Sequence, residues 1–155
     1  MNPSFPDSAT TCDDALALEQ EATQKHIALY HRSLPFGKAV TMEYRGAYGI
    51  FLDDERMESS KEYRQVLCHE LGHCATGTTH GLSSPWDLTA RHEERANRWS
   101  YGRLLPPQAI QQAINQGDCT PWQLAERFSL SEDFVRKAID YYTNAKGIRF
   151  SAPGF

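Results

Sequence analysis

The sequence has no hydrophobic run long enough to cross a membrane. Its longest uninterrupted apolar stretch runs from Ala47 to Leu52, whereas a membrane-spanning helix needs roughly 20 apolar residues. The first residues, Met1 to Asp7, also lack the basic and apolar regions of a secretory signal peptide. These absences predict a protein that is neither embedded in a membrane nor exported by that route.

Cysteine and positive charge are also scarce. The chain has four cysteines, Cys12, Cys68, Cys74 and Cys119, and none of them form a C-x-x-C pair. Neither a disulfide framework nor a zinc ribbon is therefore expected. The predicted setting is a reducing cytoplasm. The chain has 16 Lys plus Arg against 20 Asp plus Glu, a net charge of -4, with no basic block. Charge therefore gives no reason to expect binding to nucleic acid or to anionic lipid.

What is present is the composition of a globular domain: 155 residues, of which 40% are hydrophobic and 23% are charged. Periodicity and capping signals predict a helix at about 11–31, a hairpin at 39–44 and 48–52, helices at 60–76 and about 87–105, and short helices at 107–116, 121–128 and 132–142. Ser59 and Glu62 form a capping box, and Asp87 or Thr89 is the predicted cap of the helix that follows. This order predicts an α+β fold, with a first domain at 1–106 and a helical tail at 107–155 packed on it as one compact unit.

The helix predicted at 60–76 carries His69-Glu70-Leu71-Gly72-His73, an H-E-x-x-H motif. Residues four apart lie one above the other on a helix, so the imidazoles of His69 and His73 can reach one ion. Zinc is the expected ion, because two neutral imidazoles and one carboxylate leave a fourth position for water. Glu70 is then the predicted general base, a group that a purely structural zinc site does not need.

The third zinc ligand is expected on the next predicted helix, where Glu93 and Glu94 are the candidates. Glu93 shares one helical face with Ala96 and Asn97, and the small alanine would allow the two helices to approach closely. Glu94 points about 100° away, where an i,i+4 ion pair with Arg98 is expected. These faces favour Glu93 as the ligand and place Asn97 where it can hydrogen-bond a metal-bound histidine.

Two further features of a peptide-cleaving site are open at this point. An oxyanion needs a hydrogen-bond donor, and the candidates are His80, His92 and Tyr101, each of which is also explained as a surface or packing residue. The segment 46–52 fits either an edge strand that binds an extended peptide or an ordinary core strand. Sequence patterns do not separate these alternatives.

Together, these motifs resemble the ImmA/IrrE family of metallo-endopeptidases over about 39–107. The resemblance is carried by the H-E-x-x-H-C segment with Thr76-Gly77, and by His92-Glu93-Glu94-Arg95-Ala96-Asn97-Arg98-Trp99 leading into Leu104-Leu105-Pro106. It implies a zincin-like fold, one zinc held by His69, His73 and Glu93, and Glu70 as the base. Asn97 stands where the broader gluzincin pattern more often has Asp, which keeps a hydrogen-bond acceptor but loses a charge.

The resemblance implies a cytoplasmic zinc endopeptidase whose protein substrate is a phage-type or mobile-element transcriptional repressor. A second interpretation comes from residues 120–142, which resemble a helix-turn-helix: a DNA-binding or protein-binding regulator with a non-catalytic zinc site. From residue 106 onward, five Lys plus Arg balance five Asp plus Glu, and the helix that would read DNA carries both signs. A surface that contacts phosphates should be more basic, so the charge argues against DNA binding.

Overall fold

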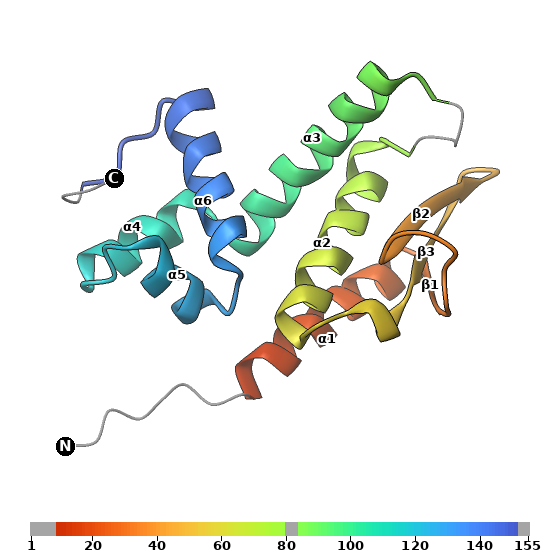
Figure 1. Ribbon diagram of the computed structural model, residues 1–155, viewed down its shortest axis with the longest axis horizontal. Coiled ribbons are helices and arrows are strands. Elements are labelled where there is room, and N and C mark those ends of the chain that lie inside the picture. The colour runs from red at the N-terminus through yellow and green to blue at the C-terminus, as the bar shows by residue number, and fades with distance from the viewer. Residues whose placement is uncertain (1–8, 80–83, 152–155) are drawn as a thin grey trace.

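The computed structural model describes residues 9–79 and 84–151, which form an α+β fold (Figure 1). The elements are α1 (Ala9–Gln24), β1 (Ala28–His31), β2 (Ala39–Tyr44), β3 (Ala47–Leu52), η1 (Asp54–Arg56), α2 (Ser60–Thr76), α3 (Trp86–Leu104), α4 (Pro107–Asn115), α5 (Pro121–Phe128), α6 (Glu132–Asp140) and the π-helical η2 (Tyr141–Ala145). The helices α2 and α3 run antiparallel through the centre, with the sheet on one side and α4 to α6 on the other. No helix in the described part of the chain is both long and apolar enough to span a membrane.

The sheet has the strand order β1-β3-β2, with β1 parallel and β2 antiparallel to β3. The hairpin prediction is confirmed, but the segment 46–52 is not an edge strand, because β3 pairs on both sides. The two edge strands are therefore β1 and β2. Of the strands, β2 has the most contacts with α2, so β2 is the edge next to this helix. Any peptide that extends this edge would therefore pair with β2.

The prediction of a helix at about 11–31 is wrong at its end. The helix α1 stops at Gln24, His26 has a positive φ of 57°, and residues 28–31 form β1. Ala22 and Leu29 are seven residues apart, which fits one face of a helix, but Leu29 instead pairs with Ile50 of β3. Pairing with a strand distant in sequence has outweighed the local helical pattern.

Other boundaries follow the sequence signals more closely. Ser59 caps α2 by accepting a hydrogen bond from the Glu62 amide at 3.2 Å, and Gly77 ends this helix in the left-handed conformation with φ of 62°. The predicted cap of α3 is wrong, because α3 begins at Trp86 with Pro85 at the N-cap position. Asp87 lies instead in the first turn, where its charge faces the positive end of the helix dipole.

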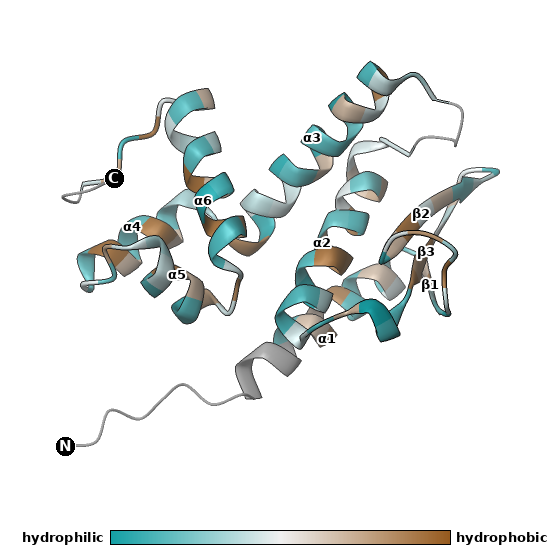
Figure 2. Cartoon of the chain, viewed as in Figure 1, coloured by the Kyte–Doolittle hydropathy of each residue, from teal (hydrophilic) through white to brown (hydrophobic). Residues whose placement is uncertain are grey.

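Buried apolar side chains form two clusters, and hydrophobic residues mark both the sheet and the helices α4 to α6 in Figure 2. One cluster joins α1, the sheet and α2, and includes Leu18, Ile50 and Leu67. The other joins the end of α3 to the helices α4 to α6. Leu104, in the last turn of α3, packs against both clusters, so α3 connects the sheet side of the molecule to its C-terminal helices.

Candidate metal centre

The site begins with the close approach of α2 and α3 at Gly72. A Cβ atom at this position would lie 2.8 Å from the carbonyl oxygen of Ala96 and 3.2 Å from its Cα. Only a glycine therefore lets the two backbones come this near. Gly72 lies between His69 and His73 on α2, and Ala96 lies one turn after Glu93 on α3. The close contact therefore brings the two histidines and Glu93 together.

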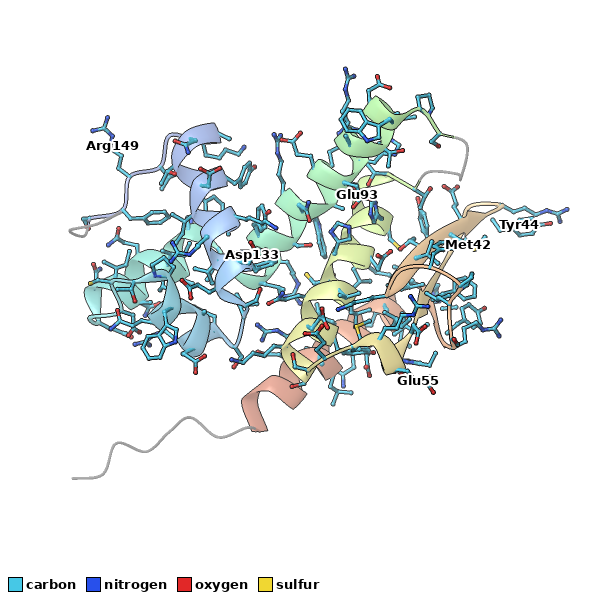
Figure 3. The ribbon with its side chains drawn as sticks, viewed as in Figure 1. Met42, Tyr44, Glu55, Glu93, Asp133 and Arg149 are labelled. Atoms are coloured by element: carbon cyan, nitrogen blue, oxygen red, sulfur yellow. The ribbon has the colours of Figure 1, made fainter. Side chains whose placement is uncertain are left out.

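Three predicted ligands meet at this crossing. The ligand atoms of His69, His73 and Glu93 all lie within 4.8 Å of one another. His69 Nε2 is 3.1 Å from His73 Nε2, and the Glu93 carboxylate oxygens lie 3.0 Å from His69 Nε2 and 3.2 Å from His73 Nε2. Figure 3 shows Glu93 on α3, facing α2. Glu94 instead pairs with Arg98 of the same helix.

These distances fit a tetrahedral metal ion. Ligand atoms that each lie about 2.0 Å from a tetrahedral zinc are separated by about 3.3 Å. The two Nε2 atoms lie 3.1 Å apart, and each lies 3.0 or 3.2 Å from a different oxygen of the Glu93 carboxylate, which is close to this value. Two imidazole nitrogens and one carboxylate are also a donor set that divalent transition metals prefer. The residues present can therefore hold such an ion without rearrangement of the two helices.

The far nitrogens of both imidazoles are held by other groups. His69 Nδ1 donates to Asn97 Oδ1 at 2.9 Å, and His73 Nδ1 donates to the backbone oxygen of Thr78 at 3.1 Å. With the proton kept on Nδ1, each Nε2 can give up the proton that it shares with Glu93 and would then offer its lone pair to a metal ion at the centre of the cluster. Thr78 was not predicted from the sequence, because it reaches His73 only through the left-handed turn at Gly77.

Electrostatics favour an ionised carboxylate at the centre. Hydrogen bonds from His69 and His73 hold the pKa of Glu93 well below its usual range. Burial lowers the pKa of His69, but its hydrogen bond to Glu93, the nearby charge of Glu70 and its other contacts outweigh burial and raise it. Each pKa shift reflects attraction between the negative carboxylate and the imidazoles. A divalent cation at the same point would find a negative ligand already in place.

Glu70 lies beside this cluster and is held by the edge strand. Its carboxylate Oε2 accepts a hydrogen bond of 2.5 Å from Thr41 Oγ1, and both side chains are only 7% exposed. Thr41 belongs to β2 and was not predicted, because no local pattern indicates which strand residue faces α2. The Thr41 hydroxyl therefore holds one of the two carboxylate oxygens, Oε2.

Two hollows meet at Glu70. One of about 190 Å³ is lined by Phe36, Ala39, Val40, Thr41, Glu70, His73, Thr79 and Glu93. The other, of about 340 Å³, is lined by Lys38, Ala39, Gln65, Val66, His69, Glu70, Asn97, Ser100 and Phe134. Glu70 and Ala39 line both hollows, so the carboxylate lies between two spaces that open next to the ligand cluster.

The three candidate oxyanion donors have different positions. His80 lies outside the described residues. His92 is half-buried on α3 beside Glu93. Tyr101 lies two turns beyond Glu93, about 12 Å along the helix, and its ring packs against Phe134 and Tyr141 with centroids 5.2 and 5.8 Å away. Tyr101 lines neither hollow at Glu70, and its contacts are those of a packing residue.

Comparison with known proteins supplies the family. The model of the IrrE N-terminal-like domain (Peptidase_M78) matches residues 17–140. This range includes the H-E-x-x-H helix, the helix that carries Glu93, and all of α4 to α6. No curated protein and no solved structure matches the chain. The chain therefore belongs to the IrrE N-terminal-like domain family of metallopeptidases.

Proposed function

We propose that this protein is a zinc-dependent endopeptidase that hydrolyses peptide bonds in a cytoplasmic protein. The observation that carries the proposal is the meeting of His69, His73 and Glu93 beside the buried carboxylate of Glu70. Three protein ligands leave the fourth tetrahedral position open, which is typical of catalytic rather than structural zinc. When bound, zinc supplies the Lewis acidity that activates water and polarises the scissile carbonyl.

Glu70 performs the proton transfers in this proposal. Its carboxylate accepts a proton from the attacking water and delivers that proton to the leaving nitrogen of the cleaved bond. Thr41 holds one carboxylate oxygen by its hydrogen bond of 2.5 Å, so the other oxygen is presented to the water. Asn97 and the Thr78 carbonyl keep the two imidazoles in the orientation and tautomer that metal binding requires.

The finer substrate proposal rests on the resemblance of the motifs to the ImmA/IrrE peptidases. We propose that the substrate is a transcriptional repressor of phage or mobile-element type. Among the described residues no strand pairs with the outer edge of β2 beside Glu70, and this edge supports an extended protein segment as the bound form, because such a segment can pair with a strand edge.

Two observations disfavour a DNA-binding regulator. The helix that would read DNA, α6, pairs its basic side chains with its own acids: Arg136 with Glu132 at 2.5 Å and Lys137 with Asp133 at 2.7 Å. The same helix also packs on α3, where Phe134 meets Tyr101. The acids beside these cations leave α6 with little net positive charge to attract phosphate.

Metal analysis tests the proposed centre directly. We expect about one zinc per chain in protein purified without chelator, clear loss of zinc in Glu93→Gln, and full retention in the matched control Glu94→Gln. Glu70→Gln should retain zinc but lose cleavage of a mixture of synthetic peptides of random sequence. Zinc binding that survives Glu93→Gln but not Glu94→Gln would refute the ligand set, and cleavage by Glu70→Gln would refute the mechanism.

A further inference from the structure

One stripe of α2 connects the ligand cluster to the C-terminal helices. Lys61, Gln65, His69 and His73 recur every four residues, so they share one side of the helix. Lys61 pairs with Glu126 of α5 at 3.2 Å. The stripe that carries the two histidines therefore also holds the tail of the chain.

Gln65 fixes the start of α6 one helical turn before His69. Its side-chain amide donates to Ser131 Oγ at 3.1 Å and accepts from the Ser131 backbone amide at 2.6 Å. Ser131 in turn caps α6 by accepting a hydrogen bond from the Phe134 amide at 3.2 Å. These bonds place the first turn of α6, marked by Asp133 in Figure 3, against α2 and α3.

The side chain of Phe134 is thereby held at the site. Its ring packs edge-on against Tyr101 of α3, with centroids 5.2 Å apart. Phe134 is half-buried and lines the hollow of about 340 Å³ that also holds His69, Glu70 and Asn97. The C-terminal helices thus contribute an aromatic wall to the space next to the general base.

Most polar groups that line this hollow have partners. Lys38 pairs with Glu62 at 2.5 Å, Asn97 accepts from His69, and the Ser100 hydroxyl donates to the Ala96 carbonyl at 3.0 Å. Ala39, Val66 and Phe134 form the apolar lining, and the other lining residues are Gln65, which bonds Ser131, and the site residues His69 and Glu70. A hollow with an apolar wall, in which most polar groups already form hydrogen bonds, favours the binding of an apolar side chain.

We propose that Phe134 is a specificity-determining residue of the peptidase. It selects, on one side of the scissile bond, a peptide residue with a large apolar side chain, which fills the hollow between α2, α3 and α6. This inference rests on the proposed function, since the guest is the side chain of a peptide positioned for cleavage at Glu70. The helical tail is then part of the substrate site.

Cleavage profiling tests the role of Phe134. The zinc-loaded native protein, Phe134→Ala and the control Trp122→Ala, which changes a 62% exposed aromatic of α5, are each incubated with synthetic peptides of random sequence. Mass spectrometry then gives the residue preference around each cleaved bond. For Phe134→Ala we expect the preference for large apolar residues to fall about tenfold at one position. The other positions, and all positions in Trp122→Ala, should keep the native preference.

Binding gives a second readout that needs no catalysis. The best peptide is labelled and titrated into Glu70→Gln and into Glu70→Gln with Phe134→Ala, and we expect about tenfold weaker binding in the double variant. Phe134→Trp keeps the aromatic packing but narrows the hollow, so it should shift the preference towards smaller side chains. Glu70-dependent cleavage with an unchanged preference in both Phe134 variants would overturn this inference alone. Absence of Glu70-dependent cleavage by the native protein would refute the proposed function, and this inference with it.

Discussion

The substitution Gly72→Ala tests whether the close crossing of α2 and α3 builds the metal centre. The added Cβ would lie 2.8 Å from the Ala96 carbonyl oxygen, whereas ordinary contacts begin near 3.4 Å, so the helices must separate by about 0.6 Å. The three nearest atoms, at 2.8, 3.2 and 3.3 Å, all belong to the Ala96 backbone, which has no rotamer that moves them away. Overpacking of this kind lowers the free energy of unfolding by roughly 1–3 kcal/mol. The better helix propensity of alanine raises it by about 0.5–1 kcal/mol.

Gly72→Ala should reduce zinc affinity more than it reduces the stability of the fold. The proposed ligands come from both sides of the crossing, His69 and His73 from α2 and Glu93 from α3. Metal–ligand distances tolerate deviations of only about 0.2 Å, so a separation of about 0.6 Å should weaken zinc binding at least about tenfold, or about 1.4 kcal/mol. Chelator competition measures the affinity, and urea unfolding of the metal-free protein measures the stability.

Gly102→Ala is the matched control, because Gly102 lies in α3 and a Cβ there would meet nothing within 4 Å. We expect this variant to gain about 0.5–1 kcal/mol in unfolding free energy and to bind zinc as the native protein does. The reasoning is refuted if Gly72→Ala gains the same stability as Gly102→Ala and keeps the native zinc affinity.

Three further predictions follow from single hydrogen bonds. Thr41→Val should lower kcat about 10- to 100-fold with unchanged zinc content, because Glu70 loses the hydroxyl that orients it. Thr41→Ser keeps a hydroxyl and should retain most activity. Equal rates in the two variants would contradict this role of Thr41. Asn97→Ala should weaken zinc binding about 10- to 100-fold, while Asn97→Asp, which keeps the acceptor for His69, should not. Chelator competition measures the zinc affinity of both variants. Native affinity in Asn97→Ala would show that the hydrogen bond from His69 to Asn97 does not support zinc binding. Tyr142→Phe should cost about 1–2 kcal/mol in urea unfolding, because the Leu105 carbonyl loses its hydrogen bond of 3.0 Å. Burial raises the pKa of Tyr142 from 10.0 to about 12, so its contribution is present below pH 10 and is lost as the pH rises towards 12; an unchanged pH dependence in Tyr142→Phe would count against this assignment.

The sequence by itself determined the helices that carry the site. The capping of α2 by Ser59, its end at Gly77 and the spacing of His69 and His73 are local signals, since they depend on residues within one or two helical turns. The same periodicity distinguishes Glu93 from Glu94: in the structure Glu93 faces His69, while Glu94 pairs with Arg98. Helical faces are predictable because contacts at i+3 and i+4 define them.

Only the tertiary structure decided what surrounds these helices. The pairing of β1 with β3 overrode a helical pattern, and it made β3 the central strand, so that β2 is the edge strand next to Glu70. The contact of Thr41 with Glu70 and of Gln65 with Ser131 each join residues far apart in the chain. Sequence periodicity describes one element at a time, whereas strand order, the approach of two helices and the walls of a hollow depend on contacts between elements. The three proposed metal ligands were therefore visible in the sequence, but the groups that hold Glu70 and line the hollow beside it were not.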